Sequence, residues 1–497
     1  MRVIDTRTGK FASASAAILN GIAPSGGLYV PERFPHIGLE SINALADKSY
    51  SERAYEILRQ ILPEFPQDTL KYTVSSAYSG GRFSGENAAP LARMDDNTYI
   101  LELYRGPTLA FKDFALQLLP GLMRISAAIE HSPAKRLILT ATSGDTGKAA
   151  LESFADQSDT ACVVFYPENG VSEAQRLQMV TQRGGNTYVI AVRGNFDDAQ
   201  TGVKKLFGDI EFNRHMQSLG WSLSSANSIN FGRLIPQVAY YFSAYADMIK
   251  ARRIKCGDHV HFVVPTGNFG NILACDYARR MGLPVGKMVC ASNANNVLTD
   301  FITTGVYDAR RALRVTSSPS MDILISSNLE RFIYEMVDRD AERVADMMHG
   351  LRSTGSFAVD PLELVAIKAR VIAGWADETL TRETISGIWR SFGKLIDTHT
   401  AVGMSVLNDL RNQCKLTDAP AVLVSTASPF KFGRDVAQSV LGTDMSSLDD
   451  FRCCDALAGE TGEKVPESIS ELPRKPILHK AACEPEQMCE TVLKLLQ

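Results

Sequence analysis

The sequence predicts an α/β protein with mostly parallel β-sheets. Six short apolar runs have the length and composition of buried strands, and helical patterns of apolar residues follow most of them. The runs are RLILTAT (136–142), ACVVFYP (161–167), NTYVIAV (186–192), HVHFVVP (259–265), GKMVCAS (286–292) and APAVLVST (419–426). Strands that alternate with helices are typical of parallel sheets, in which ligands bind at the carboxyl ends of the strands. We therefore expect the chemistry in the loops that follow these runs.

The first part of the chain, up to about residue 95, has a different character. Its segment PSGGLYVPERFP (24–35) is dense in Gly and Pro, and predicts turns around a short apolar strand. Two amphipathic helices are predicted near 39–47 and 51–61, and YSGGRFSGENAAP (78–90) has the composition of a linker. The residues from Met445 onward are acidic at first and finish in a short amphipathic helix. They predict a peripheral appendage without an assigned role.

Length and composition exclude several classes of protein. A chain of 497 residues is too long for one core and predicts about two to four domains. The net charge of −4, without a long basic run, argues against nucleic acid or an anionic membrane as the partner. No apolar run reaches the roughly 18 residues of a membrane span. The nine cysteines lack CxxC spacing and the eight histidines form no HExxH, so we expect reduced thiols, a cytoplasmic location and no metal site.

The segment GPTLAFKDFALQLL (106–119) contains the strongest candidate for catalysis. It follows TYILELYR (98–105), which predicts a strand, and a Gly-Pro pair ends that strand. Lys112 then falls among apolar residues at helical spacing, between Phe111 and Phe114. Burial there would lower the pKa of the amine and make it nucleophilic, as a lysine that forms a Schiff base requires. The ordinary alternative is a surface lysine of an amphipathic helix, whose amine reaches solvent.

The loop TSGDTGK (142–148) begins where a predicted strand ends. It differs from a P-loop at two positions, because Thr142 replaces the first Gly and Ala149 replaces the final Ser or Thr, so an NTPase is excluded. Ser143, Thr146 and the backbone amides of a helix N-terminus would suit a carboxylate or another anion. A helix cap that binds nothing would use the same residue types, and both interpretations stay open.

Two further loops have the composition of phosphate sites. PTGNFGN (265–271) carries two glycines, which let successive backbone amides surround a phosphate, but it lacks GxGxxG spacing. SSANSINFGR (224–233) concentrates hydroxyls and amides ahead of Arg233, which suits a phosphate monoester. A polar turn that caps a helix fits this second loop equally well. STASPFKFG (425–433) is a fourth loop that directly follows a predicted strand.

Together these segments resemble the threonine synthase family, whose members are fold-type-II pyridoxal-phosphate enzymes. The family's motifs stand here in order as GPTLAFKDF, ATSGDTG, SANSIN, PTGNFGN and STASPFKF. The resemblance extends from GLYVPE (27–32) to about residue 440. It implies a fold similar to the tryptophan synthase β subunit, with two open, twisted, mostly parallel sheets flanked by helices, and an N-terminal domain. It also implies four parts: an N-terminal domain (1–95), a large cofactor-binding domain (96–130 and 256–440), a smaller α/β lobe (131–255) and a C-terminal appendage (441–497).

The resemblance further implies a role for each motif. Lys112 would bind pyridoxal 5'-phosphate covalently, and Thr426 would meet the pyridine nitrogen. The cofactor's phosphate would be surrounded by Gly267, Asn268, Phe269, Gly270 and Asn271. The substrate carboxylate and the cofactor's ring hydroxyl would be contacted by Ser143, Asp145 and Thr146. The substrate's phosphate would be held by Ser228, Asn230 and Arg233.

Some matching positions carry no assigned role. Asp113 and His399 lie in segments that resemble the family, but the resemblance does not fix what they do. The family's N-terminal Ser-Thr-Arg signature is present only in part, as Thr6–Arg7.

The activity implied is conversion of O-phospho-L-homoserine and water to L-threonine and phosphate, by γ-elimination and then β-addition of water. A phospho-lyase that releases 2-oxobutyrate stays open, because the sequence does not fix where water attacks. A catalytically silent cofactor-binding homologue also stays open, although it would not need to keep Lys112. We expect a monomer or homodimer that acts on a small molecule.

Overall fold

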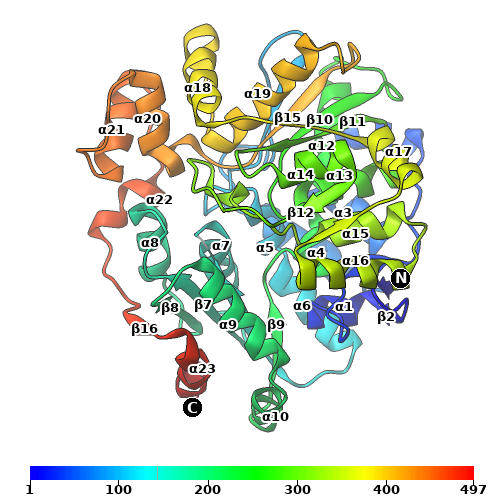
Figure 1. The fold of residues 1–497 in the computed structure, drawn as a ribbon, viewed down its shortest axis with the longest axis vertical. Coiled ribbons are helices and arrows are strands. Elements are labelled where there is room, and N and C mark those ends of the chain that lie inside the picture. The colour runs from blue at the N-terminus through cyan, green and yellow to red at the C-terminus, as the bar shows by residue number, and fades with distance from the viewer. Residues whose placement is uncertain (143, 497) are drawn as a thin grey trace.

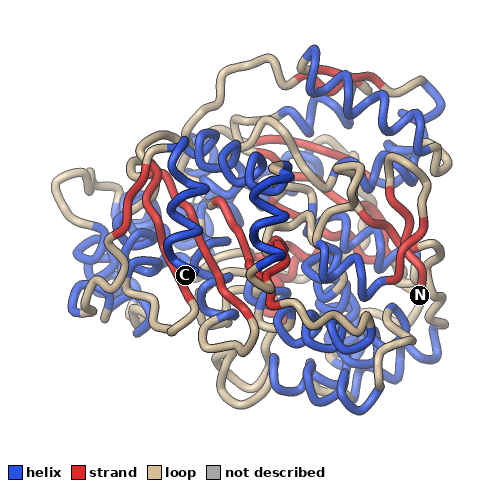
Figure 2. Tube along the Cα trace, turned by 90° about the horizontal axis from the view of Figure 1, so that it is seen from below, coloured by secondary structure: helices blue, strands red, loops and turns tan. Residues whose placement is uncertain are grey.

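The computed structural model describes residues 1–142 and 144–496, and its main strands form two separate, mostly parallel sheets covered by helices (Figures 1 and 2). All six strands predicted from the apolar runs are present, and each lies within two residues of its predicted bounds. The predicted α/β fold is therefore confirmed.

The larger sheet has six strands in the order β14-β11-β10-β15-β5-β4. Adjacent strands in this sheet run parallel, except for β4 and β5, which run antiparallel to each other. The strands are β4 Leu91–Arg93, β5 Thr98–Glu102, β10 Val260–Pro265, β11 Val285–Ser292, β14 Val371–Trp375 and β15 Ala421–Ser425. The helices that pack on this sheet and its connections include α12 Pro236–Lys250, α13 Gly270–Arg280, α14 Val297–Thr304 and α19 Thr398–Asn412. Its register brings the carboxyl ends of β5, β10 and β15 to one edge.

The smaller sheet has five parallel strands in the order β16-β8-β7-β6-β9. They are β6 Lys135–Ala141, β7 Thr160–Pro167, β8 Thr187–Val192, β9 Trp221–Ser225 and β16 Ala481–Cys483. The associated helices are α7 Asp145–Phe154, α8 Glu173–Val180, α9 Phe196–Gly208 and α10 Ile210–Ser218. Leu139 pairs with Ser225, so the loops that follow β6 and β9 leave the sheet at the same edge.

The N-terminal segment forms an antiparallel three-stranded sheet and four helices. The strands are β1 Arg2–Asp5, β2 Phe11–Ser13 and β3 Tyr29–Pro31. The helices are α1 Ala14–Asn20, α2 Leu39–Ala44, α3 Tyr50–Ile61 and α4 Gln67–Tyr78. The short strand and the two amphipathic helices predicted here, α2 and α3, are confirmed, whereas α4 was not predicted.

The incomplete N-terminal signature has a structural function. Arg7 donates two hydrogen bonds to the carboxylate of Glu330, through Nε at 2.9 Å and Nη2 at 2.7 Å. The Thr6 hydroxyl donates to the same carboxylate at 2.6 Å. Glu330 lies in α15 (Leu329–Met336), so Thr6 and Arg7 link the N-terminal sheet to this helix.

The remaining elements connect these units. They are α5 Lys112–Leu116, α6 Leu119–Ile129, α11 Phe231–Leu234, β12 Val306–Asp308, α16 Ala341–Thr354, β13 Ser356–Ala358, α17 Pro361–Arg370, α18 Glu378–Phe392 and α20 Gly433–Leu441. Among the described residues, no helix combines the length and apolarity needed to cross a bilayer.

The C-terminal segment runs along one side of the molecule, from the larger unit to the smaller sheet (Figure 1). It contains α21 Asp450–Thr461, α22 Glu467–Ser470, β16 and α23 Met488–Leu496. β16 adds an edge strand to β8, and α23 packs on α9. A segment expected to be peripheral therefore completes the smaller sheet, and it also packs on α8 through α21 and α22.

Candidate active site

The candidate site lies where loops from both sheets meet. Lys112 is the first residue of α5, and the backbone holds it at the end of β15: the Phe111 N–H donates to the Thr426 carbonyl at 2.9 Å. An isolated β-bridge between Ala110 and Ala427 strengthens the same junction. The buried Thr426 is thus beside the lysine loop, and its contact with the pyridine nitrogen stays a prediction.

The Lys112 side chain is largely buried. It is 12% exposed, and Nζ lies 3.1 Å from Asp145 Oδ2 and 3.2 Å from Ser320 Oγ. Burial lowers the pKa of the amine from its ordinary 10.5, the Asp145 carboxylate opposes that shift, and the nearby Lys431 and Arg233 cations add to it. The desolvation predicted from the apolar neighbours is present. The amine therefore has the lowered basicity that a nucleophile needs.

Asp145, the first residue of α7, accepts four contacts. Oδ2 receives Lys112 and the Ser320 hydroxyl, the latter at 3.3 Å. Oδ1 receives Lys431 at 2.8 Å and the Gln175 amide at 3.1 Å. Burial by itself would raise the pKa of this carboxyl, but Lys112 and Lys431 hold it well below its ordinary 3.8. Asp145 is therefore an ionised carboxylate between two lysines.

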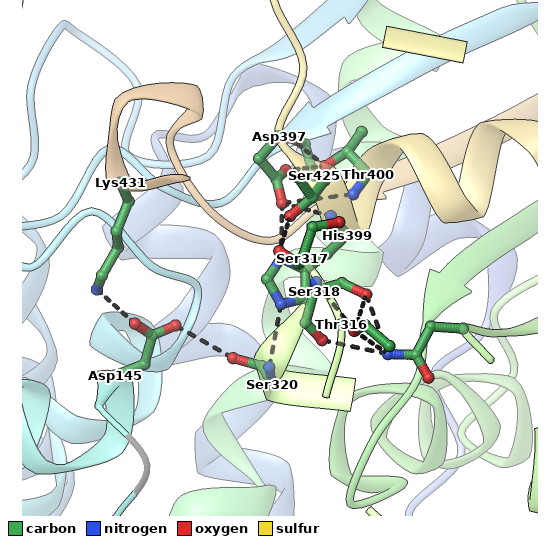
Figure 3. A network of polar contacts seen from close by, with 12 residues as sticks. Asp145, Thr316, Ser317, Ser318, Ser320, Asp397, His399, Thr400, Ser425 and Lys431 are labelled. Atoms are coloured by element: carbon green, nitrogen blue, oxygen red, sulfur yellow. Dashed lines mark hydrogen bonds and ion pairs between the residues drawn. The ribbon is translucent and has the colours of Figure 1, made fainter. Parts of the chain in front are cut away.

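The contacts continue beyond Ser320 to a histidine and a second carboxylate, as Figure 3 shows. The Ser320 N–H donates to His399 Nε2 at 3.2 Å, and His399 Nδ1 lies 2.9 Å from Asp397 Oδ1. Because Nε2 accepts a hydrogen bond, the ring proton belongs on Nδ1, facing Asp397. His399, whose role the sequence left open, thus holds the backbone of Ser320 in place.

The loop after β10 is built to expose backbone amides. Phe269 has the left-handed conformation, with φ of 60°, and no side chain caps the first turn of α13. The carbonyls of Gly267 and Asn268 are held from the other side, by the Ser326 hydroxyl at 2.7 Å and by the Asn328 backbone N–H at 3.1 Å. The amides at this helix N-terminus are therefore available to an anion.

Gly267 and Asn271 complete this loop. A Cβ added to Gly267 would lie 2.4 Å from the Ser320 carbonyl oxygen, so only glycine fits there. The Asn271 side-chain oxygen accepts hydrogen bonds from the hydroxyls of Tyr240 and Tyr241, while its Nδ2 is a buried donor without an acceptor. An unsatisfied buried donor favours a bound acceptor at this site.

The loop after β6 is organised differently. Thr142 Oγ1 accepts the backbone N–H groups of Gly144 at 2.9 Å and Gly147 at 3.0 Å. Thr146 is half-buried in the first turn of α7, and the predicted contact of Ser143 lies outside the described residues. Part of the anion site expected in these amides is thus filled by the loop's own threonine.

The loop after β9 places a buried arginine near the lysine. Arg233 is 3% exposed, and its Nη1 donates to the Ala226 carbonyl at 2.6 Å, but its Nε has no partner. No carboxylate in the described part of the chain forms an ion pair with it, and burial lowers the pKa of the guanidinium to about 10. Ser228 lies against the phosphate loop, since a Cβ added to Gly270 would be 3.7 Å from the Ser228 Cβ.

Asn230 and Asp113 shape the loops. The Asn230 amide donates to the carbonyls of Ile18 and Ser225, and its oxygen accepts the Gly232 N–H. These contacts occupy the side chain with backbone groups, and direct contact of Asn230 with substrate stays a prediction. The buried Asp113 accepts both the N–H and the hydroxyl of Thr108, at 2.9 and 2.6 Å, and burial raises its pKa to about 6.

Sequence reasoning missed Ser320, Gln175 and Lys431. Ser320 belongs to a loop outside the strand-to-helix pattern, and Gln175 reaches the site from α8. Lys431 stands in STASPFKFG, the segment that also contains Thr426. A lysine between two phenylalanines, six residues beyond the end of β15, is the signal that could have identified it.

The site fits pyridoxal phosphate by its own chemistry. A buried amine of lowered pKa suits the aldehyde, bare amides at a helix N-terminus suit the phosphate, and the Asn271 Nδ2 is a donor that lacks an acceptor.

Comparison with known proteins identifies the family. A family model described as "Threonine synthase N terminus" matches residues 2–78, and one described as "Pyridoxal-phosphate dependent enzyme" matches residues 87–427. Among solved structures, PLP-bound threonine synthase from Brucella melitensis has a TM-score of 0.87 and 35% identity, with all of both chains covered. Threonine synthase from yeast has a TM-score of 0.87 and 30% identity, covering 100% of this chain and 98% of the other.

The relatives include two kinds of protein. Threonine synthase of Pseudomonas aeruginosa is 38% identical over 448 residues, which cover 89% of this chain and 91% of that protein. Human threonine synthase-like 1 is 39% identical over 436 residues, but these cover 86% of this chain and only 58% of that protein. The chain thus spans less than two thirds of the length of the threonine synthase-like relatives it matches. The chain belongs to the threonine synthase family of fold-type-II pyridoxal-phosphate-dependent enzymes.

Proposed function

We propose that this protein is a threonine synthase, which converts O-phospho-L-homoserine and water to L-threonine and phosphate. The observation that carries the proposal is the buried Arg233, whose guanidinium has an unpartnered Nε and no carboxylate partner among the described residues. A buried guanidinium without a counter-ion is costly unless an anion from outside completes the site. A phosphate ester is the anion that a guanidinium binds best.

The charges of the site support an anionic substrate. Lys431 and Arg233 are buried basic residues, Lys112 is a largely buried third one, and Asp145 is the carboxylate that faces the two lysines. The cofactor's phosphate and the substrate's phosphate would supply the missing negative charge. Ser228 lies against the phosphate loop, so the two anions would bind in neighbouring loops.

The residues proposed for the cofactor remain those of the sequence motifs. Lys112 would hold it covalently, Thr426 would meet the ring nitrogen, and the phosphate would lie among the amides of Gly267, Asn268, Phe269, Gly270 and Asn271. When bound, pyridoxal phosphate supplies an electron sink for negative charge at the substrate carbons. Asp145 would contact the ring hydroxyl, and Ser143 and Thr146 would hold the substrate carboxylate.

The chain's own part in the chemistry is proton transfer and positioning. We assign to the Lys112 amine the removal and return of protons at the substrate's α- and β-carbons, because a neutral amine is both a base and, once protonated, an acid. The Ser320 hydroxyl, 3.2 Å from Lys112 Nζ, would orient that amine. Arg233 and Ser228 would hold the phosphate as it leaves from the γ-carbon.

Product analysis tests the reaction. Purified protein is given O-phospho-L-homoserine, and the organic product is identified while phosphate release is followed. Threonine with stoichiometric phosphate would support the synthase. Phosphate with 2-oxobutyrate would assign a phospho-lyase, and no phosphate from cofactor-loaded protein would leave a silent homologue or another substrate.

Arginine substitution tests the phosphate site. Arg233→Gln keeps a donor for the Ala226 carbonyl but removes the charge, and we expect the substrate's KM to rise roughly 100-fold, since hydrogen bonds to charged groups contribute about 1.5–3 kcal/mol. Arg136→Gln is a matched control, because Arg136 is also buried with an unpartnered Nε but lies at the opposite end of β6. Equal KM values for the two variants would show that Arg233 does not bind the substrate's phosphate.

The protein is proposed to act in the cytoplasm, as a monomer or homodimer. Its nine cysteines are all free, which suits a reducing compartment.

A further inference from the structure

Lys431 is a second buried lysine of the site, and neither its motif nor the proposed reaction gives it a role. It lies in a short 3₁₀ segment, Pro429–Phe432, directly after β15, and its side chain is 1% exposed. Its Nζ is 2.8 Å from Asp145 Oδ1 and donates to the Thr108 carbonyl, also at 2.8 Å. Lysine is rarely buried to this degree unless it is paired, so the Asp145 contact accounts for its charge.

The two lysines use the two oxygens of one carboxylate. Lys112 approaches Oδ2 at 3.1 Å while Lys431 holds Oδ1 at 2.8 Å (Figure 3 shows the second contact). Three other ionisable groups act on this network: Arg233 on Lys112, His399 on Asp145, and Asp113, which is hydrogen-bonded to Thr108, on Lys431. One carboxylate balances one buried ammonium, and a second ammonium without a counter-ion is costly. One of the two lysines is therefore expected to give up its proton.

The contacts decide which lysine stays charged. The second partner of Lys431 is the Thr108 carbonyl, which only accepts hydrogen bonds and so favours an ammonium. The contacts of Lys112 are longer, at 3.1 Å to Asp145 and 3.2 Å to the Ser320 hydroxyl, than the contacts of Lys431, both at 2.8 Å. Charge-assisted hydrogen bonds are about 2.7–2.9 Å long, so these distances place the ammonium on Lys431. The burial of Lys112 and the proximity of Lys431 both act in the same direction.

We propose that Lys431 is the permanent counter-ion of Asp145, and thereby a positioning residue that leaves Lys112 as the neutral, nucleophilic amine. This inference rests on the role proposed above for Lys112, but it does not depend on the identity of the substrate. A merely structural Lys431 would instead fasten the lysine loop through Thr108, and its charge would not matter.

The test measures the protonation of each lysine in the full-length chain stripped of cofactor. Trace acetic anhydride acetylates only neutral amines, and mass spectrometry gives the pH midpoint of labelling for each lysine separately. In the wild-type chain we expect Lys112 to be labelled with a lower pH midpoint than Lys431. The reverse order would overturn the proposal without any variant.

Two substitutions separate charge from structure. Lys431→Gln can still donate to Asp145 and Thr108 but is neutral, and Lys431→Arg keeps the charge. With Gln, we expect Lys112 to stay protonated to higher pH, so that its labelling at neutral pH falls at least tenfold, the change that corresponds to about one pKa unit. Arg should restore labelling to within about threefold of wild type, less than half of such a unit.

A control variant changes a lysine outside this network. Lys148 lies in α7, the helix that begins at Asp145, and it pairs with Glu152. The labelling of Lys112 should be the same in Lys148→Gln as in the wild type. Wild-type labelling of Lys112 in a folded Lys431→Gln chain would overturn the proposal, as would equal losses with Gln and Arg. Because the experiment contains neither cofactor nor substrate, a failed threonine assay and a failed charge assignment are distinguishable.

Discussion

The loops after β6 and β10 are alike in sequence, but only in the first does a side chain of the loop occupy the backbone amides at the helix start. Each follows a buried parallel strand and opens a helix, and each was expected to bind an anion through backbone amides. After β6, Thr142 accepts the N–H groups of Gly144 and Gly147, and the loop supplies its own anion, Asp145. After β10, no side chain caps α13, and the loop carbonyls are held by the segment 326–328.

The difference shows what decides whether a helix N-terminus binds an external anion. The dipole and the orphan amides are present in both loops, because every helix has them. An external ligand can use them only where the loop's own side chains leave them free. The first loop therefore presents a carboxylate to two lysines, and the second presents bare amides to a phosphate.

The largest effect is expected from removing the charge of the first loop. Asp145→Asn would leave Lys112 and Lys431 without a carboxylate, and breaking a buried ion pair in this way costs about 3 kcal/mol. We expect this loss in urea unfolding at neutral pH. Asp346→Asn, at an exposed position of α16, should change stability by less than about 0.5 kcal/mol.

The pH dependence of that loss has a defined sign. The folded-state pKa of Asp145 lies below its unfolded value of 3.8, so its contribution is complete above that value and disappears as the pH falls through the folded-state pKa. The gap between wild type and Asp145→Asn should be constant near neutral pH and shrink in acid. A gap that widens in acid would show that Asp145 is not the ionised partner of the lysines.

In the loop after β10, a steric clash with the backbone is expected to lower the stability. Gly267→Ala would place a Cβ 2.4 Å from the Ser320 carbonyl oxygen, a backbone atom that cannot move alone. Overpacking of this kind costs about 1–3 kcal/mol, and the shift should also weaken cofactor binding. Gly270→Ala is the matched change, since its nearest neighbour is Asn328 Nδ2 at 3.4 Å. Equal unfolding midpoints for the two variants would contradict the packing assigned to Gly267.

The loop after β6 carries a carboxylate, Asp145, but a carboxylate in the loop after β10 should weaken phosphate binding there. Asn271→Asp keeps an acceptor for Tyr240 and Tyr241 but brings a negative charge to the amides proposed for the cofactor's phosphate. Like charges in contact cost several kcal/mol, so we expect the Kd for pyridoxal phosphate to rise about 100-fold. Titration of the stripped chain measures this. Asn296→Asp, at the start of α14, should leave the Kd unchanged, and a similar Kd for Asn271→Asp would move the phosphate elsewhere.

Sequence patterns predicted the strands and the strand-end loops that surround the site. The strands are read from apolar runs because parallel strands are buried on both faces, and the loops at their carboxyl ends follow from that. Each strand and loop is a property of a short segment, so one stretch of sequence carries the information needed for it. The apolar neighbours of Lys112 left a surface lysine open, and the other motifs in order favoured the Schiff-base lysine.

The parts that could not be predicted depend on distant contacts. Ser320 meets Lys112 across more than 200 positions of the chain. β16 contains only Ala-Ala-Cys and has no strand pattern of its own, so its place beside β8 depends on the partner edge. The contrast between the two loops was also hidden, because the choice between a capped and a bare helix start depends on where Thr142 and the segment 326–328 point.

The smallest effect is expected from a substitution that makes the loop after β6 resemble the loop after β10. Thr142→Ala removes the acceptor of the Gly144 and Gly147 amides, and loss of such a cap costs about 1 kcal/mol, whereas Thr142→Ser keeps the hydroxyl and should lie close to wild type. Hydrogen exchange at the two amides should accelerate in the Ala variant. Because its amides are then bare, as those after β10 are, inorganic phosphate should raise its unfolding temperature more than that of the Ser variant. If phosphate stabilises both variants equally, side-chain capping is not what separates these two loops, and the charge of Asp145 alone excludes anions from the first.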